Sequence, residues 1–155
     1  MTESVSLQDR FAPNLMCFGC GPKNEHGLQL KSFEEGELIV AEWNGQPYHQ
    51  AFEGMLNGGI IGSLLDCHCN WAGCIRLMKE QGAATPPCCV TAEYTIKLHH
   101  PTPIAEPVKL RSWAEKAKGR LAIVKGEMWS GEILTAECEG VFVAVKPGHP
   151  AYHRW

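Results

Sequence analysis

The segment from Leu56 to about Glu80 constrains the fold most, because it has the pattern of one helix that is apolar around most of its circumference. Asn57 is a suitable N-cap for this helix, and Gly82 lies just past its expected end. Its apolar positions are Ile60, Ile61, Leu64, Leu65, Cys67, Trp71, Cys74, Ile75 and Met78. A helix with so little polar surface has to be buried, so the rest of the chain is expected to surround it.

The rest of the chain has the pattern of β-structure. Alternating apolar and polar residues predict strands at residues 27–33, 37–43, 87–98, 108–118, 120–129 and 132–145. The alternation in the third of these strands places Val90, Ala92 and Tyr94 on one face and Thr91 and Glu93 on the other. Residues 1–26 are expected to be irregular, and residues 148–155 to be a tail. The order ββαββββ predicts an α+β fold, in which an antiparallel sheet wraps around one long central helix in a single domain spanning residues 1–155, with its core at about 27–146.

Composition and charge exclude several classes of protein. The 155 residues carry a net charge of −3, and no run of Lys or Arg exceeds two residues, so no basic surface for nucleic acid is expected. The most apolar stretch, residues 60–65, is too short to span a bilayer, and the first ten residues lack the pattern of a signal peptide. The eight cysteines therefore fit a cytoplasmic protein with reduced, mostly buried thiols better than a secreted disulfide scaffold.

The start of the predicted helix, Asn57-Gly58-Gly59, is the first candidate site. Two residues without a Cβ lie where a helix exposes unpaired N–H groups and a partial positive charge. Such a terminus suits an anion, or a carbonyl oxygen that becomes one during acyl transfer. The alternative is that Asn57 only caps the helix and that the glycines only permit tight packing.

Asp66 is the second candidate, seven residues after Gly59 and on nearly the same helix face, where Ser63 and Asn70 extend a polar stripe. A carboxylate in a buried helix is costly unless it is paired or functional, which favours a general base or nucleophile over a carboxylate that only binds loop backbone. Seven residues correspond to about 10 Å along a helix, so both groups cannot touch one carbonyl from the same helix. A two-fold dimer with antiparallel helices would place Gly59 of one chain opposite Asp66 of the other, so an active site here would be shared.

At these residues the sequence resembles the hotdog-fold acyl-CoA thioesterases of the PaaI-like and 4-hydroxybenzoyl-CoA thioesterase type, over about residues 15–146. Segments 17–28 and 95–103 contribute to the resemblance, and segment 54–66 is the most specific. In that segment the family has His-Gly-Gly and an acidic residue nine positions after the His, and Asp66 is nine positions after Asn57. The resemblance implies a sheet wrapped around a long helix and dimers joined edge to edge. It also implies that the Gly59 N–H polarises the thioester carbonyl, and that Asp66 of the partner subunit attacks it or activates the attacking water.

Two departures from the family pattern bear on activity. Asn57 stands where the family has His, and Cys67 stands where a Glu often follows the acidic residue. An Asn side chain does not titrate near neutral pH, although it can cap a helix and donate a hydrogen bond, so proton transfer would rest on Asp66 or water. A non-catalytic hotdog module that binds acyl-CoA or another acyl thioester is therefore the alternative function. A hotdog hydratase acting on enoyl-CoA is a further one, but the sequence lacks its motif of an Asp and a downstream His.

Three other features are weaker candidates. Cys17-x-x-Cys20 with His26 offers half of a zinc site at most, because a structural site needs four ligands and no second CxxC follows. His49 lies in the loop before the helix, where the family places residues that face the substrate. The basic residues within 116–120 surround a turn and suit either CoA phosphates or a solvated hairpin tip.

Together these observations predict hydrolysis of a small or medium acyl-CoA thioester to the free acid and CoA. The site is expected at the interface of a homodimer, with a homotetramer left open. The residues assigned to catalysis are Asp66, Gly59 and Asn57, and those assigned to substrate binding are Gly58, Ser63, Asn70 and His49. No metal and no redox cofactor are expected, since CoA enters only as part of the substrate, and neither nucleic acid nor a membrane is an expected partner.

Overall fold

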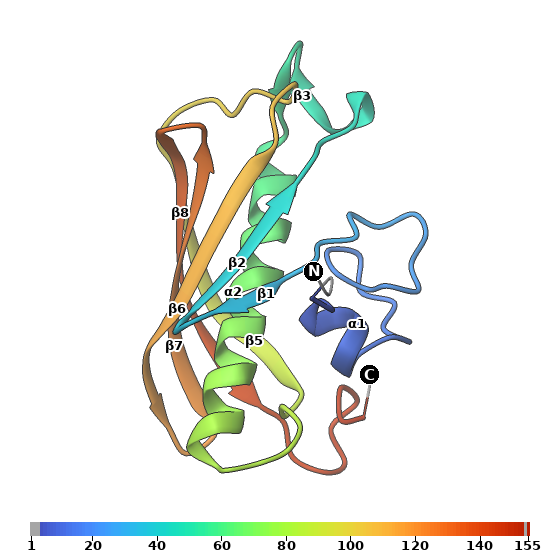
Figure 1. The fold of residues 1–155 in the computed structure, drawn as a ribbon, viewed down its shortest axis with the longest axis vertical. Helices are drawn as coiled ribbons and strands as arrows, with labels where there is room; N and C mark the ends of the chain where they lie inside the picture. The colour runs from blue at the N-terminus through green and yellow to red at the C-terminus, as the bar shows by residue number, and fades with distance from the viewer. Residues whose placement is uncertain (1–3, 154) are drawn as a thin grey trace.

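One long helix, α2 (Gly58–Glu80), packs along a six-stranded antiparallel sheet in the computed structural model, which describes residues 4–153 and 155 (Figure 1). In spatial order the strands are β1 (Phe33–Glu35), β2 (Leu38–Trp43), β6 (Val108–Lys118), β7 (Leu121–Ser130), β8 (Ile133–Ala144) and β5 (Cys89–Leu98). The sheet covers one side of α2, and the N-terminal segment covers the other (Figure 1). The predicted α+β arrangement of one long helix and an antiparallel sheet is thus confirmed.

The N-terminus of α2 is capped as the sequence predicts. Asn57 Oδ1 accepts a hydrogen bond from the Ile60 N–H at 3.1 Å. Leu56, expected within the helix, instead belongs to the two-residue strand β4 (Met55–Leu56), which pairs with β3 (Gln50–Phe52) outside the main sheet. A short 3-10 helix, η1 (Pro47–His49), precedes β3, so the expected loop before α2 is an ordered hairpin.

The contact between α2 and the sheet is close enough to require small residues. A Cβ added at Gly73 of α2 would lie 3.4 Å from the Cβ atoms of Ala122 and Phe142. A Cβ added at Gly126 of β7 would lie only 2.5 Å from the Cys69 Sγ, so this glycine makes room for the buried sulfur. The cysteines in this layer therefore act as small apolar side chains, as the composition suggested.

The first predicted strand, residues 27–33, is wrong. Leu28, Leu30 and Ser32 are buried, which explains the alternating pattern, but residues 27–32 pair with no other strand in the described part of the chain. Gln29 has a φ of 58°, a left-handed conformation that no regular strand contains. Its side-chain NH2 group donates to three carbonyl oxygens of residues 21–24, so this segment is a loop held by side-chain hydrogen bonds.

Strand β5 contains a bulge that changes which side chains face α2. Thr91 pairs with Phe142 and Glu93 pairs with Val141, so Ala92 is an extra residue in the ladder. The prediction that Val90, Ala92 and Tyr94 share one face is therefore wrong. The bulge reverses the alternation after Thr91, and the Thr91 hydroxyl reaches α2.

The N-terminal segment is fixed to α2 by a buried set of polar groups, here called the His68 network: Gln8, Ser32, His68 and the Ile39 carbonyl. His68 Nε2 donates to the Ile39 carbonyl oxygen at 2.8 Å, and its Nδ1 accepts from the Ser32 hydroxyl at 2.9 Å. Gln8 accepts from the Ser32 N–H at 2.7 Å and donates to the Ser32 Oγ at 3.0 Å. Gln8 lies in α1 (Leu7–Phe11), a short helix within a segment that the sequence predicts to be irregular. Burial lowers the pKa of His68 to about 4, so its imidazole is neutral at pH 7.

The C-terminal residues also differ from the expected tail. The Trp155 ring stacks on Trp71 of α2, with centroids 4.9 Å apart and an interplanar angle of 19°. The chain end therefore lies against the same side of α2 as the N-terminal segment (Figure 1). None of the helices in the described part of the chain has the combined length and apolar character that a bilayer-spanning segment needs.

Candidate active site

Asp66 lies near the middle of α2, where it is half-buried and faces β5. One of its carboxylate oxygens accepts a hydrogen bond from the Thr91 hydroxyl at 2.6 Å. Hydrogen bonds to a carboxylate at this length are among the stronger ones in proteins, so β5 fixes the orientation of the carboxylate. The strand alternation assigned Thr91 to the opposite face, and the bulge at Ala92, which periodicity does not reveal, brings it here.

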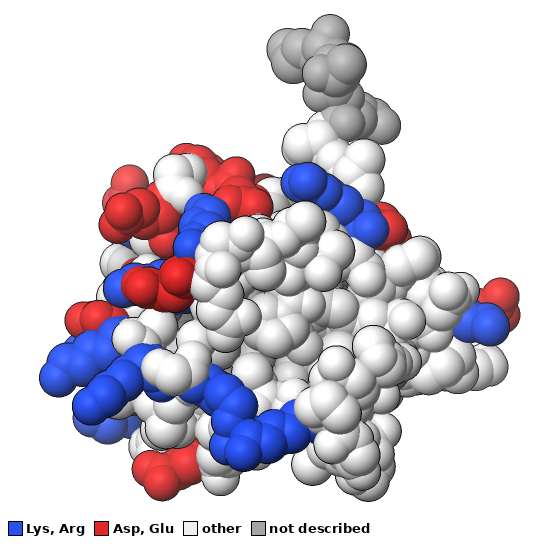
Figure 2. Space-filling model, turned by 90° about the horizontal axis from the view of Figure 1, so that it is seen from below, with Lys and Arg blue, Asp and Glu red and all other residues white. Residues whose placement is uncertain are grey.

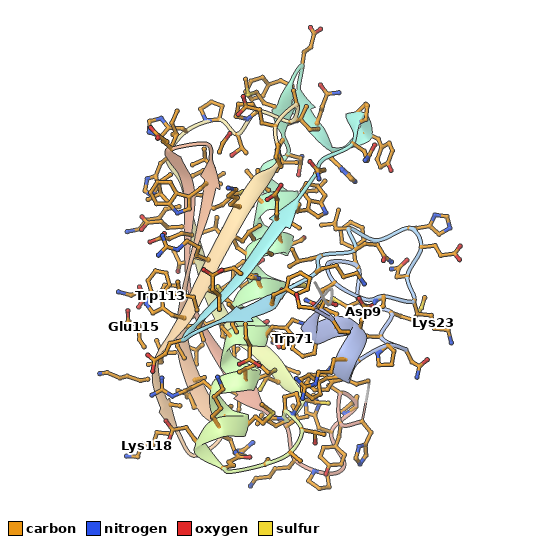
Figure 3. The ribbon with its side chains drawn as sticks, viewed as in Figure 1. Asp9, Lys23, Trp71, Trp113, Glu115 and Lys118 are labelled. Atoms are coloured by element: carbon orange, nitrogen blue, oxygen red, sulfur yellow. The ribbon has the colours of Figure 1, made fainter. Side chains whose placement is uncertain are left out.

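A cavity of about 480 Å³, here called the Asp66 cavity, opens beside this carboxylate. Its walls come from α2, β5, the N-terminal segment and the C-terminal residue, and they include Cys17, Asp66, Asn70, Trp71, Thr91 and Trp155. Figure 3 shows Trp71 pointing from α2 toward the N-terminal segment. The size is within the range of small-molecule sites, and the wall combines aromatic surface with a few polar groups, as such sites do.

A larger hollow of about 880 Å³ lies elsewhere, between the β1–β2 hairpin and the C-terminal half of α2. Arg76, Lys79 and Arg111 border it, together with Trp113. None of the residues assigned to catalysis or substrate binding lies in its wall, so the smaller Asp66 cavity is the better candidate site.

The glycines at the start of α2 differ in their surroundings. Gly59 is exposed, whereas a Cβ added at Gly58 would lie 3.2 Å from the Leu98 Cδ1 of β5. No residue in the described part of the chain accepts a hydrogen bond from either N–H, because the Asn57 side chain binds the N–H of Ile60 instead. Gly59 therefore lies at an accessible helix terminus, where an N–H group without an internal acceptor suits an external oxygen.

Gly59 and Asp66 do not belong to one pocket within a single chain. They are seven residues apart on α2, about 10 Å along its axis, and Gly59 is not part of the wall of the Asp66 cavity. Ser63 lies between them, and its hydroxyl donates to the Gly59 carbonyl at 3.0 Å. The two predicted catalytic groups could therefore act on one carbonyl only if they came from different chains.

Asn70 lines the Asp66 cavity but is also held by the protein. Its Nδ2 donates to the Cys89 carbonyl at 3.2 Å, and its Oδ1 accepts from the Cys74 thiol at 3.3 Å. Asn70 therefore fastens the start of β5 to α2, so it supports the cavity wall that carries Thr91.

His49 lies outside the Asp66 cavity, next to the helix cap. Its Nδ1 accepts from the Gln46 N–H at 2.9 Å, and its carbonyl accepts from the Asn57 N–H at 2.9 Å. Its ring lies 5.2 Å from the ring of Trp43, and partial burial lowers the pKa of its imidazole. The contacts in the structure thus place His49 behind Asn57, where it holds the chain that enters α2.

The basic residues of the β6–β7 hairpin are far less enclosed. Lys116 and Lys118 are exposed, and Arg120 donates to the Ala144 carbonyl at 2.8 Å. Lys118 lies near the end of the sheet (Figure 3), and Figure 2 shows Lys and Arg gathered along one side of this end of the molecule. This arrangement agrees with the solvated hairpin tip that the sequence left open as one interpretation.

Three cysteines meet at the wall of the Asp66 cavity. The Sγ atoms of Cys17, Cys20 and Cys67 all lie within 4.8 Å of one another, and that of Cys17 is 3.6 Å from that of Cys67. The sequence singles out Cys17 and Cys20 by their spacing, but it assigns Cys67 only to the helix. His26, considered with them, is exposed and does not belong to this group.

Comparisons with known proteins agree with this architecture. Residues 53–137, more than half of the chain, match the family model of the thioesterase superfamily. A thioesterase superfamily protein from Shewanella loihica has a similar structure, with 27% identity, a TM-score of 0.66, and coverage of 81% of this chain and 98% of that one. No curated protein matches the chain in sequence.

Two more distant structures are similar in fold alone. The PaaI protein of the phenylacetic acid degradation operon of E. coli has 12% identity, a TM-score of 0.65, and coverage of 77% of this chain and 81% of that one. A thioesterase from Haemophilus influenzae has 16% identity, a TM-score of 0.66, and coverage of 79% and 84%. The family match includes the helix that carries Gly59 and Asp66, and it agrees with the observed layers of sheet and helix. The chain therefore belongs to the thioesterase superfamily and has its hotdog fold.

Proposed function

We propose that this protein hydrolyses a small or medium acyl-CoA thioester to the free acid and CoA. The observation that carries the proposal is the Asp66 carboxylate, held at 2.6 Å by Thr91 in the wall of a cavity, on the helix of a thioesterase-superfamily domain. A carboxylate in this setting can take a proton from water or attack a carbonyl carbon. We expect the protein in the cytoplasm, where its thiols would stay reduced.

The proposed reaction uses two chains. The Gly59 N–H of one chain donates to the thioester carbonyl oxygen, and Asp66 of the partner subunit removes a proton from water, or attacks the carbonyl itself. When Asp66 acts as the base, the water oxygen bonds to the carbonyl carbon, the C–S bond breaks, and the CoA sulfur leaves with the proton that Asp66 took from water. When Asp66 attacks, its carboxylate oxygen bonds to the carbonyl carbon, the C–S bond breaks, and the CoA thiolate leaves. Water then cleaves the resulting mixed anhydride, which gives the free acid, restores the carboxylate and supplies the proton that the thiolate takes up. Asn57 caps α2 and helps orient the carbonyl. These steps need no metal and no redox cofactor.

The free edge of β5 supports the two-chain arrangement. In this chain β5 is the last strand of the sheet, and it exposes Tyr94 at 45% and Leu98 at 57% of their surface. An exposed strand edge with large apolar side chains is a template for pairing with another strand. Antiparallel pairing of β5 with its copy would extend the sheet across a homodimer and bring the two α2 helices alongside in opposite directions. A tetramer of two such dimers is compatible with this pairing.

The test is a panel of acyl-CoA substrates assayed for release of free thiol. The enzyme should release thiol from at least one small or medium acyl-CoA. An Asp66→Ala variant should lose turnover while it keeps its affinity for acyl-CoA. A protein that binds acyl-CoA tightly but hydrolyses none of the panel would instead be the non-catalytic module that Asn57, in place of His, allows.

The oligomer is tested separately by sedimentation of the purified protein at micromolar concentration. A dimer or a tetramer is expected. A stable monomer with full activity would contradict the shared site but not the hydrolysis itself.

A further inference from the structure

Cys17, Cys20 and Cys67 form a sulfur triangle that the proposed hydrolysis does not use. Two of them come from the N-terminal loop and the third from α2, fifty residues later in the chain. All three sulfurs lie within 4.8 Å of one another, and they line the Asp66 cavity. Three thiolates bound to one Zn²⁺ at about 2.3 Å have sulfurs about 3.8 Å apart, close to the 3.6 Å between Cys17 and Cys67.

The loop between the first two cysteines is built around two glycines that bring the sulfurs together. A Cβ added at Gly19 would lie 2.4 Å from the Cys67 Sγ, so only a glycine lets α2 approach the loop at this point. A Cβ added at Gly21 would lie 2.4 Å from both the Cys17 nitrogen and the Leu15 carbonyl oxygen. The Gly21 N–H also donates to the Cys17 carbonyl at 2.8 Å, which closes a tight turn around Cys20. The packing of this turn therefore requires glycine at positions 19 and 21.

Hydrogen-bond donors surround the sulfurs. The thiols of Cys20 and Cys67, followed by the backbone N–H groups of Cys20 and Gly19, lower the pKa of the Cys17 thiol. The hydrogen bond to Cys17 raises the pKa of both Cys20 and Cys67, while the Trp71 side chain donates to Cys20 and partly opposes this effect. N–H donors directed at cysteine sulfur are outer partners of the kind that support metal–thiolate bonds.

We propose that Cys17, Cys20 and Cys67 bind one thiophilic divalent cation, of which Zn²⁺ is the representative, and that its fourth coordination position faces the Asp66 cavity. Sulfur ligands select zinc-like cations over Mg²⁺ and Ca²⁺, which prefer oxygen. Three protein ligands with one open position is a recognised zinc arrangement, and the cavity beside the sulfurs leaves room for water or a ligand atom there.

The proposed cation would join two parts of the chain that otherwise meet through side-chain contacts. It would fix the Cys17–Cys20 turn to α2 one residue away from Asp66, and so hold the N-terminal wall of the cavity in place. The inference does not depend on the acyl-CoA proposal, because a binding module with the same fold would have the same three sulfurs.

The test is the metal content of reduced protein. After saturation with Zn²⁺ and gel filtration, we expect one zinc per chain in the unchanged protein and in Cys88→Ser. Cys88 is a partly exposed cysteine outside the triangle and serves as the matched control. Cys17→Ser and Cys67→Ser should each lower the zinc content at least tenfold. X-ray absorption at the zinc edge should report three sulfur neighbours at about 2.3 Å and one lighter atom.

A second measurement does not depend on folding of the variants. Titration of the metal-stripped, reduced protein with Cd²⁺ should produce thiolate charge-transfer absorbance that saturates at one equivalent per chain, and Zn²⁺ should raise the unfolding temperature. Zinc bound below one equivalent, or bound equally by Cys17→Ser, would overturn the proposal. Recovery of a metal-free protein with a disulfide between Cys17 and Cys20 or Cys67, despite saturating zinc, would also overturn it.

Discussion

Two neighbouring parts of α2 have opposite surroundings. His68 lies in a network where both ring nitrogens have partners and where Gln8, Ser32 and His68 have no exposed surface. Asp66 and Cys67 instead border an open space of about 480 Å³, and the Asp66 carboxylate is oriented by a hydroxyl from another element. The His68 network is closed, whereas the Asp66 cavity is open to a ligand.

This difference predicts that one part of α2 contributes mainly to stability and the neighbouring part mainly to turnover. Buried polar groups that are fully hydrogen-bonded make a unique packing arrangement, and they are costly to disturb. Polar groups at the wall of a cavity can exchange a solvent contact for a ligand. Changes in the His68 network should therefore alter the free energy of unfolding and leave turnover unchanged, and changes at the Asp66 cavity should do the reverse.

The largest expected effect is a loss of turnover from Asp66→Asn in the Asp66 cavity. The amide has the shape of the carboxylate and can still accept from Thr91, but it cannot act as a base, so kcat for acyl-CoA hydrolysis should fall about 10²–10⁴-fold. The free energy of unfolding by urea should change little, which makes the unfolding midpoint the internal control. An Asp66→Asn variant with normal turnover would remove Asp66 from the reaction.

The next largest effect is expected in the His68 network, where the free energy of unfolding should depend on pH. Burial lowers the pKa of His68 from 6.5 to about 4. Between these values the unfolded chain binds a proton that the folded protein does not, so the free energy of unfolding should fall as the pH drops from 6.5 to 4. The total loss should be about 3 kcal/mol, with no contribution from His68 above pH 7.

Urea unfolding of the protein and of His68→Gln, at several pH values in this range, measures this contribution. The difference in free energy of unfolding between the two should shrink as the pH falls, because the variant lacks the titrating group. A difference that stays constant from pH 7 to 4.5 would mean that His68 takes up a proton as readily in the folded protein as in the unfolded chain.

Features that depend on residues close together in the sequence could be predicted, whereas features that depend on distant residues could not. Asn57 and α2 could be predicted because capping and apolar periodicity are local properties, and Asp66 stands out as a charge on an apolar helix. The left-handed Gln29 could not be predicted, because a loop that buries alternate residues has the same pattern as a strand.

The walls of the site were harder to predict than its carboxylate. Thr91 reaches Asp66 only because one residue is inserted in the pairing of β5 with β8, and no local pattern marks that insertion. Cys67 meets Cys17, and Trp155 meets Trp71, across fifty or more residues of sequence. Such contacts are set by tertiary packing, so a single sequence contains the residues but not their proximity.

A smaller effect, on the free energy of unfolding, is expected from Ser32→Ala in the His68 network. The substitution removes the hydroxyl that binds both His68 Nδ1 and Gln8 Nε2, and it leaves two buried polar atoms without these partners. The free energy of unfolding should fall by about 2 kcal/mol, and kcat should stay within twofold of the original. Thr85→Ala, in the exposed loop after α2, is the control and should change neither quantity. A loss of turnover in folded Ser32→Ala would show that the two sites are coupled.

The smallest effect is expected from Thr91→Val, which tests whether the hydrogen bond from Thr91 orients the Asp66 carboxylate. Valine keeps the shape of threonine and suits a strand, so β5 and its bulge should persist, but the hydrogen bond of 2.6 Å to Asp66 is lost. If this bond only orients the carboxylate for reaction, kcat should fall about tenfold, which corresponds to about 1.4 kcal/mol, with little change in KM or in the unfolding midpoint. Thr85→Val, the same change in the exposed loop after α2, is the control and should leave kcat unchanged. The opposite result would be a lower unfolding midpoint with normal kcat. It would show that Thr91, like His68, stabilises the fold, and that its hydrogen bond does not orient the Asp66 carboxylate for the reaction.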